Sequence, residues 1–258
     1  MRVWEAASLL FFLYVGALTP LGNRSHETRA RLYLGVAAGF LFIAVVANIR
    51  YIAVLHDWLA PPVALLLGYW TSGWLFTAPR ADQERMLMSL DRRLRIVEIA
   101  RRLPRWIAAL LEAAYAGVYV AIPLSLVVHL WSVPQASAER FWTVILLTDF
   151  VCFAVLPWVQ TRPPRALEKA APWASLIRRF NLQMLGAASI KVNTFPSGHA
   201  AEALAAALLV LGAPALVVGF MFALALAISA GTVFGRYHYA ADAFSGWLIA
   251  VVVWIVVR

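Results

Sequence analysis

Eight long apolar stretches constrain the fold of this sequence more than any other feature. In lipid the backbone must satisfy its own hydrogen bonds, so segments that cross a membrane are expected to be helices. The 258 residues are 63% hydrophobic and 14% charged, against about 45–50% and about 25% in soluble domains. An ordinary water-soluble enzyme is therefore excluded. We predict an all-α, multi-span transmembrane helical bundle of about eight helices, at residues 6–22, 32–54, 59–78, 106–132, 141–160, 198–211, 214–234 and 239–257.

The sixth stretch, residues 198–211, is short for a membrane span. At 1.5 Å per residue it covers only about 21 Å, and the sequence Gly212-Ala213-Pro214 separates it from the next stretch. Its N-terminus is therefore expected to begin below the membrane surface, inside the protein.

Residues 80–105, between the third and fourth stretches, hold eight arginines. Their apolar side chains recur with helical spacing, which predicts a helix lying on the membrane surface, with a solvated charged linker as the alternative. The apolar side comprises Met86, Leu90, Leu94, Val97 and Ala100, and the polar side comprises Glu84, Asp91, Arg95, Glu98 and Arg102.

Positive charge is distributed unevenly between the two ends of the predicted spans. The loops after odd-numbered spans carry 18 of the 22 Lys and Arg residues, and the remaining segments carry 4. The positive-inside rule then places the odd loops in the cytoplasm. We expect a multi-pass protein of the bacterial inner membrane. Its formal net charge of +9 favours anionic membrane lipids or a phosphorylated substrate as partners, and no nucleic acid.

Two segments at span boundaries carry the chemistry. Asn193–His199 places a Ser-Gly-His sequence at a helix start, where free N–H groups and the helix dipole favour an anion. Gly235–Asp242 places His238 and Asp242 four residues apart, on one helix face. A carboxylate at that spacing fixes one ring nitrogen and leaves the other free to attack. His199 and His238 thus form a candidate acid and nucleophile pair.

A third segment, Thr161-Arg162-Pro163-Pro164-Arg165, ends the fifth span. Because successive spans alternate in direction, Arg162, His199 and His238 are expected on the same side of the membrane. A guanidinium group is suited to binding phosphate oxygens through two parallel hydrogen bonds.

These three segments, in this order, resemble the signatures of the type 2 phosphatidic acid phosphatase and vanadium haloperoxidase superfamily. Asn193–His199 and His238-Tyr239 are most similar to the branch of inositol phosphorylceramide synthases. The resemblance covers roughly residues 150–250. It implies two extra N-terminal transmembrane helices in residues 1–58 and, in residues 59–258, a phosphatidic-acid-phosphatase-like catalytic domain with a six-helix core.

The resemblance also implies a role for each motif residue. His238 would be the nucleophile, Asp242 its orienting partner, and His199 the acid that protonates the leaving alcohol. Arg162 would bind the phosphate together with Ser197 and Gly198. No cofactor and no metal is expected, and the sequence shows no carboxylate cluster suited to magnesium.

Two basic residues of the phosphatase pattern are missing from their usual places, which Val155 and Thr232 occupy. Arg165 and Arg236 are the candidate substitutes for these phosphate ligands. A site with fewer cations fits a phosphodiester, with one negative charge, better than a phosphomonoester with two. This favours transfer of a substituted phosphate.

Several other polar and aromatic residues have a structural explanation beside a functional one. Glu112 and Asp149 are intramembrane acids and therefore candidates for function, but a buried Tyr or Arg partner is the favoured explanation. Glu202, three residues after His199, is expected either to tune this histidine, to bind a headgroup or to form an ion pair. The residues expected to serve packing or structure are Tyr115, Tyr119, His26, His56 and His129.

The leading functional hypothesis is a metal-independent membrane phosphatase or phosphotransferase that acts on lipid phosphate esters through a phosphohistidine. The alternatives are a phosphodiester headgroup transferase, a non-enzymatic transporter and a non-catalytic lipid-binding scaffold. The sequence leaves open the lipid tail, the headgroup, the acceptor and the oligomeric state.

Overall fold

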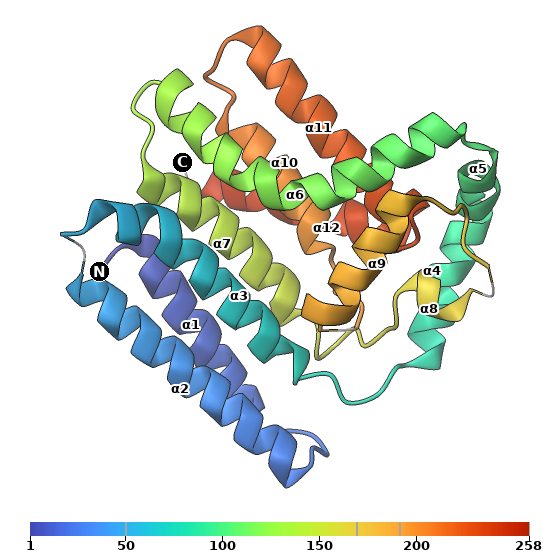
Figure 1. Cartoon of the computed structure of the whole chain (residues 1–258). Coiled ribbons are helices and arrows are strands. Elements are labelled where there is room, and N and C mark those ends of the chain that lie inside the picture. The colour runs from blue at the N-terminus through green and yellow to red at the C-terminus, as the bar shows by residue number, and fades with distance from the viewer. Residues whose placement is uncertain (50, 169, 191, 258) are drawn as a thin grey trace.

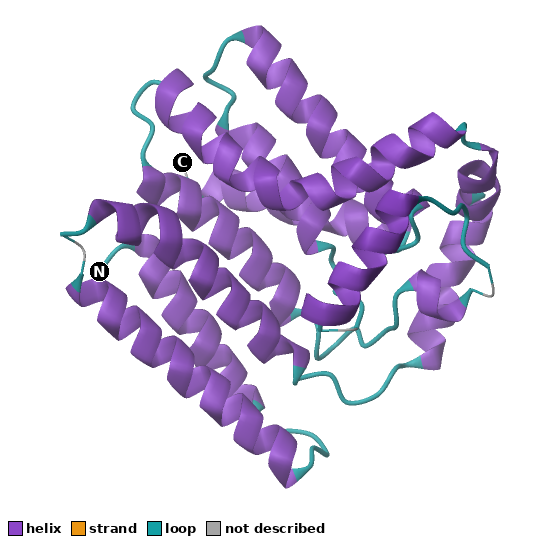
Figure 2. Ribbon diagram, in the orientation of Figure 1, coloured by secondary structure: helices purple, strands orange, loops and turns teal. Residues whose placement is uncertain are grey.

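The computed structural model describes residues 1–49, 51–168, 170–190 and 192–257, and over these residues it contains helices and no strand (Figure 2). The all-α prediction is therefore confirmed. The helices are α1 (Val3–Leu18), α2 (His26–Asn48), the π-helical turn η1 (Leu55–Leu59), α3 (Ala60–Gly73), α4 (Ala81–Arg93), α5 (Ile96–Arg102), α6 (Arg105–Ser132), α7 (Ala138–Ala154), α8 (Pro164–Leu167), α9 (Leu176–Ala188), α10 (Gly198–Leu209), α11 (Ala215–Phe234) and α12 (Ala240–Val256).

Each of the eight predicted apolar stretches overlaps a helix, namely α1, α2, α3, α6, α7, α10, α11 and α12, with ends that differ by up to six residues. Within the described residues, three of them, α2, α6 and α11, are long and apolar enough to cross a membrane by length and composition alone. The α1, α10 and α12 helices are shorter apolar helices. At 12 residues, α10 is as short as its sequence predicts.

The helices form two groups that meet at α7 (Figure 1). On one side α1, α2 and α3 pack together, and on the other α10 packs among α6, α11 and α12. The α10 helix is surrounded because its buried residues are small, and small side chains let helices approach closely in a membrane. These small buried residues are Gly198, Ala200, Ala201, Ala203, Ala205, Ala206 and Ala207, and Leu209 is the one larger buried side chain among the described residues of α10.

Residues 80–105 form two helices, α4 and α5, instead of the single surface helix that the spacing predicts. The break lies at Arg95, whose φ of 54° places it in the left-handed region. Glu84 and Asp91, expected on the solvated side, are 5% and 2% exposed. Both are buried because loops of the C-terminal half pack over this side of α4. The apolar side chains of Met86, Leu90 and Leu94 are exposed.

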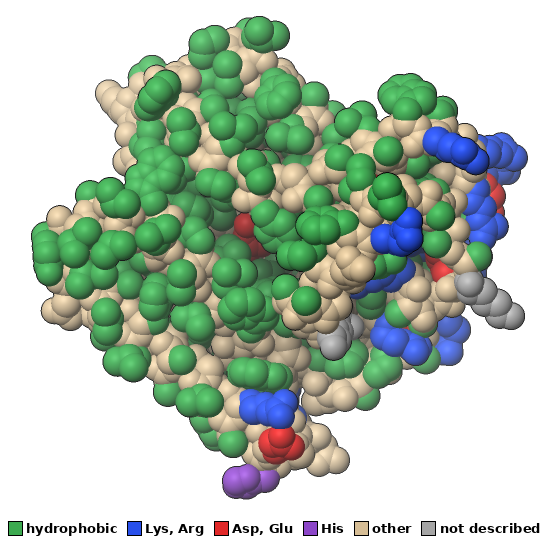
Figure 3. Space-filling view, viewed as in Figure 1, with side chains coloured by type: hydrophobic (Ala, Val, Ile, Leu, Met, Phe, Trp, Pro, Cys, Tyr) green, Lys and Arg blue, Asp and Glu red, His purple; other side chains and the backbone are tan. Residues whose placement is uncertain are grey.

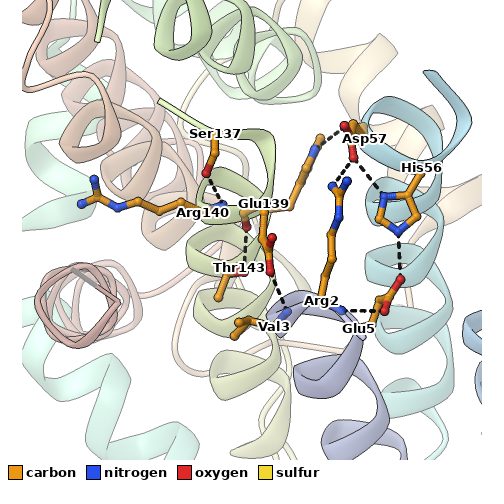
Figure 4. A network of polar contacts seen from close by, with 10 residues as sticks. Arg2, Val3, Glu5, His56, Asp57, Ser137, Glu139, Arg140 and Thr143 are labelled. Carbon is orange, nitrogen blue, oxygen red and sulfur yellow. Dashed lines mark hydrogen bonds and ion pairs between the residues drawn. The ribbon is translucent and has the colours of Figure 1, made fainter. Parts of the chain in front are cut away.

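A polar network ties the N-terminal helices to the start of α7 (Figure 4). Buried Glu5 accepts a hydrogen bond from the Arg2 backbone N–H and contacts His56 Nε2 at 2.8 Å. Asp57 contacts His56 Nδ1 at 2.9 Å and forms an ion pair with Arg2. The indole of Trp142, in α7, donates to the Asp57 backbone carbonyl. His56 therefore has the structural role that the sequence predicts.

The division of the chain at residue 59 stays a prediction. The α3 helix, which begins at Ala60, packs against α1 and α2 as well as α7. The charge count used to predict sidedness includes Arg50, Lys169, Lys191 and Arg258, which lie outside the described residues.

Candidate active site

The head of α10 is fixed against the head of α12. The Ser197 N–H donates to the Asp242 carbonyl at 2.9 Å, and the Ser197 hydroxyl accepts from the Ala200 N–H. A Cβ on Gly246 would lie 2.6 Å from the Ser197 carbonyl oxygen, so glycine at this position allows the two histidine segments to meet. A Cβ on Gly198 would lie 2.8 Å from Asp149 Oδ1, so this glycine lets the head of α10 approach α7.

The Asp242 carboxylate organises the second segment. It is fully buried, and its Oδ2 accepts from the Tyr239 N–H at 3.0 Å and contacts His238 Nδ1 at 3.3 Å. The backbone N–H of His238 donates to the Thr232 carbonyl. Main chain and side chain of His238 are thus both held, and the carboxylate at Nδ1 favours the tautomer that carries its proton on Nδ1 and its lone pair on Nε2.

The two candidate catalytic histidines face one another. Their ring centroids are 6.3 Å apart with an interplanar angle of 45°. His199 is partly exposed, its ring stacks on Tyr115 with centroids 5.2 Å apart, and its Nε2 lies 3.4 Å from the Tyr119 hydroxyl oxygen. The sequence prediction that His199 and His238 share one side of the bundle fits this arrangement.

Arg165 lies beside the aromatic side chain of Tyr237. It is half-buried, its Nη1 donates to the Tyr237 carbonyl, and its guanidinium lies 5.5 Å from the centre of the Tyr237 ring. Burial lowers the pKa of Arg165, yet a guanidinium remains protonated at physiological pH.

Arg162 makes a different contact from the one expected of a phosphate ligand. Its Nε and Nη2 donate to the two carboxylate oxygens of Glu84 at 2.9 and 2.8 Å, and its backbone N–H also donates to Glu84. These hydrogen bonds lower the pKa of Glu84. The Arg162 side chain is 47% exposed, so one edge of the guanidinium remains open to a ligand.

The structure corrects the expected role of Arg236 as a phosphate ligand. The side chain is fully buried, and it pairs with Asp91 of α4 at 2.6 Å and with Glu168, at the end of α8, at 2.7 Å. Two carboxylates already neutralise this cation and satisfy its N–H groups. Arg236 is therefore a structural residue, which ties α4 and the α8 segment to the turn before His238.

Asp149 also differs from expectation. It is buried against Gly198, and the carboxyl group of Glu202 lies near enough to interact with it. A second acid thus occupies the place where a Tyr or Arg partner was expected. Figure 3 shows that an acidic side chain lies at the bottom of a hollow in an otherwise hydrophobic face, while arginines gather at the edge formed by α4, α5 and α9.

Glu112 has the buried Tyr and Arg partners that the sequence predicts. Its carboxylate binds Arg178 and the hydroxyl of Tyr237. The sequence did not predict that Tyr115 and Tyr237 would stack beside His199. The four-residue spacing of Tyr115 and Tyr119, which places them on one side of α6, was the available signal. Among the described residues no group of three or more His, Cys, Asp or Glu side chains could hold a metal ion.

No curated protein and no solved structure matches this chain. The sequence model of the PAP2 superfamily matches residues 85–256, which include α5 to α12 and every candidate site residue named above. Members of this superfamily are membrane proteins and generally phosphatases, so membership supports phosphatase-type chemistry on lipid phosphates. Since the match covers about two thirds of the 258 residues, the chain belongs to the PAP2 superfamily.

Proposed function

We propose that this protein transfers the phosphoryl group of a lipid phosphate ester through a covalent phosphohistidine on His238. The observation that carries the proposal is the facing pair of imidazoles, 6.3 Å apart, with a buried carboxylate behind His238. That separation is short enough for one phosphoryl group to contact both rings. Neither an acid alone nor a histidine alone would supply both a nucleophile and a proton donor.

In the first step, the lone pair of His238 Nε2 forms a bond to phosphorus and the bond from phosphorus to the lipid oxygen breaks. His199 donates its proton to that oxygen as it leaves. Asp242 stabilises the positive charge that develops on the His238 ring. In the second step, His199 takes a proton from water, the oxygen of that water attacks phosphorus, and the bond to Nε2 breaks to release phosphate.

Phosphate oxygens would be bound by Arg165 and by the N–H groups at the start of α10. Free N–H groups at a helix N-terminus and the helix dipole both favour an anion. The Ser197 hydroxyl accepts from Ala200 and keeps its own hydrogen available to the substrate. Arg162 would contribute through the edge that Glu84 leaves open.

A second candidate is transfer of a phosphodiester headgroup to an alcohol. It is favoured because Arg236 is held by Asp91 and Glu168, and so does not replace the basic phosphate ligand missing at Thr232. A site with few cations suits a phosphodiester with a single charge. In this reaction an acceptor alcohol takes the place of water in the second step.

The experiment uses detergent-purified protein and a panel of phosphatidate, prenyl pyrophosphate and phosphoinositide substrates, with and without an alcohol acceptor. Phosphate release from phosphatidate or prenyl pyrophosphate in the presence of EDTA would support a metal-independent phosphatase. Headgroup transfer that requires the alcohol would support the second candidate. Absence of both activities across the panel would contradict both, and would favour a transporter or a lipid-binding scaffold.

A further inference from the structure

Glu112 binds four donors with one buried carboxylate. The residue is 1% exposed, and its Oε1 accepts from Trp173 Nε1 and Arg178 Nη1, each at 2.8 Å. Its Oε2 accepts from Asn181 Nδ2 at 2.7 Å and from the Tyr237 hydroxyl at 2.6 Å. Such saturation is what a buried charge requires, and it makes Glu112 the point at which α6, α9 and the segment before α12 are joined.

The segment held by this carboxylate lies directly before His238. The same Arg178 Nη1 that contacts Glu112 also donates to the Gly235 carbonyl at 2.8 Å. A Cβ on Gly235 would lie 2.6 Å from the Tyr237 ring, so backbone and ring are in close contact at this turn. Glu112 thus holds the Tyr237 side chain directly by its hydroxyl and the turn indirectly through Arg178.

The Tyr237 ring continues toward the second histidine. It lies parallel to the Tyr115 ring, with centroids 4.0 Å apart and an interplanar angle of 5°. The Tyr115 ring is parallel to that of His199 within 9°, at 5.2 Å. Movement of Tyr237 would therefore be transmitted to His199 through one intervening ring. His238 has independent support, since its Nδ1 contacts Asp242 and its N–H donates to Thr232.

We propose that Glu112 is a positioning residue that sets the orientation of His199 through the rings of Tyr237 and Tyr115. This proposal rests on the proposed function for its kinetic consequence, because the proton that His199 delivers to the leaving oxygen requires a defined ring orientation. Loss of the hydrogen bond between Glu112 and Tyr237 should therefore impair protonation of the leaving group more than it impairs attack by His238.

The kinetic test compares Glu112→Gln and Tyr237→Phe with the wild type on a lipid phosphate and on an aryl phosphate. Tyr237→Phe removes only the hydroxyl and keeps the ring. We expect each variant to lower kcat on the lipid phosphate by about ten- to a hundredfold, the range for lost positioning contacts, with KM changed little. An aryl phosphate needs little protonation of its leaving group, so its kcat should stay within about threefold of wild type. The double variant should lose little more than Glu112→Gln alone, because the hydrogen bond that Tyr237→Phe removes is already among the contacts of Glu112.

Glu5→Gln is the matched control. Glu5 is also a fully buried carboxylate with a close histidine partner, His56. It belongs to the N-terminal network of Figure 4 and lies in α1, which packs against α2, α3 and α7. It should destabilise the fold without changing the ratio of lipid to aryl rates. Equal losses on both substrates in Glu112→Gln, or the same change of ratio in Glu5→Gln, would overturn the proposal.

A second readout needs no activity. In protein with isotope-labelled histidine, the ring signals of His199 should move in Glu112→Gln and Tyr237→Phe, because the stacking on Tyr115 changes, and should stay in place in Glu5→Gln. Unmoved His199 signals would overturn the positioning role. If the wild type hydrolyses no substrate but His199 moves as expected, the positioning role stands and the proposed function fails.

Discussion

Two buried histidines with acidic partners, His56 and His238, lie in different parts of this protein and differ in one respect. Both ring nitrogens of His56 contact carboxylates, those of Glu5 and Asp57, and the side chain is fully buried. Within the described part of the chain only Nδ1 of His238 has a hydrogen-bond partner, Asp242, and its ring faces His199. A histidine beside an acid is thus a structural residue when both ring nitrogens contact carboxylates. It is a candidate nucleophile when one ring nitrogen has no such partner.

The largest expected effect separates these two histidines. His238→Ala should lower activity by roughly three orders of magnitude or more, because no other group can take the phosphoryl group, while thermal unfolding stays close to wild type. His56→Ala should lower the unfolding temperature, because it leaves two carboxylates without their partner. Its activity per folded molecule should stay near wild type. Activity assays paired with thermal unfolding check both, and a reversed pattern would break the comparison.

The next effect concerns His199. If His199 is the general acid, His199→Ala should slow hydrolysis of a lipid phosphate by about a hundredfold or more. An aryl phosphate, whose leaving group is stable without a proton, should be slowed much less. Steady-state rates on the two substrates provide the measurement. Equal losses would indicate that His199 only binds substrate.

Arg236 extends the comparison to a cation with two acidic partners. Arg236→Ala leaves Asp91 and Glu168 without their ion pair in a buried site, and removal of one partner of a buried pair costs about 3–5 kcal/mol of stability. Denaturant unfolding should show this loss. Any activity that Arg236→Ala loses through this destabilisation should not be restored by adding Thr232→Arg to the same variant. Unchanged stability of Arg236→Ala together with a raised KM would instead indicate that Arg236 binds the phosphate.

The smallest effect is the pH dependence that Glu84 contributes. Hydrogen bonds from Arg162 lower the pKa of this carboxyl below its ordinary value of about 4.3. The folded state therefore gains stability that is fully present above this ordinary value and is lost as pH falls through the lowered pKa. The difference in unfolding temperature between wild type and Glu84→Gln should be constant near neutral pH and shrink below about pH 4. A difference that grows on acidification would contradict the ion pair.

The sequence predicted the helices and the meeting of the two histidine segments better than the surroundings of the site. Apolar length and the four-residue spacing of His238 and Asp242 are local properties, so they can be recognised without a structure. The partners of Arg236 are Asp91 and Glu168, 145 and 68 residues away in sequence, and no local pattern indicates such contacts. The sequence therefore predicts Arg236 as a phosphate ligand, whereas in the folded protein Asp91 and Glu168 neutralise its charge.

The same reason explains the missed ring stack. Tyr115 lies in α6 and Tyr237 in the turn before α12, so their contact depends on how those helices cross. The break at Arg95 was missed because α4 and α5 share one continuous amphipathic pattern, and the left-handed residue between them is not a glycine. The pattern also predicts that Glu84 and Asp91 are exposed to solvent, because they lie seven residues apart on its polar side.

The central claim is that the phosphoryl group resides on His238 during turnover. The most direct measurement is rapid acid-free quenching of the enzyme with a radiolabelled phosphate ester, followed by tests of the stability of the labelled protein. We predict a label that is stable in alkali, lost in acid and absent from His238→Ala. In Asp242→Asn the label should form more slowly. A wild-type enzyme that turns over without any such label, or a label that persists in His238→Ala, would contradict the account.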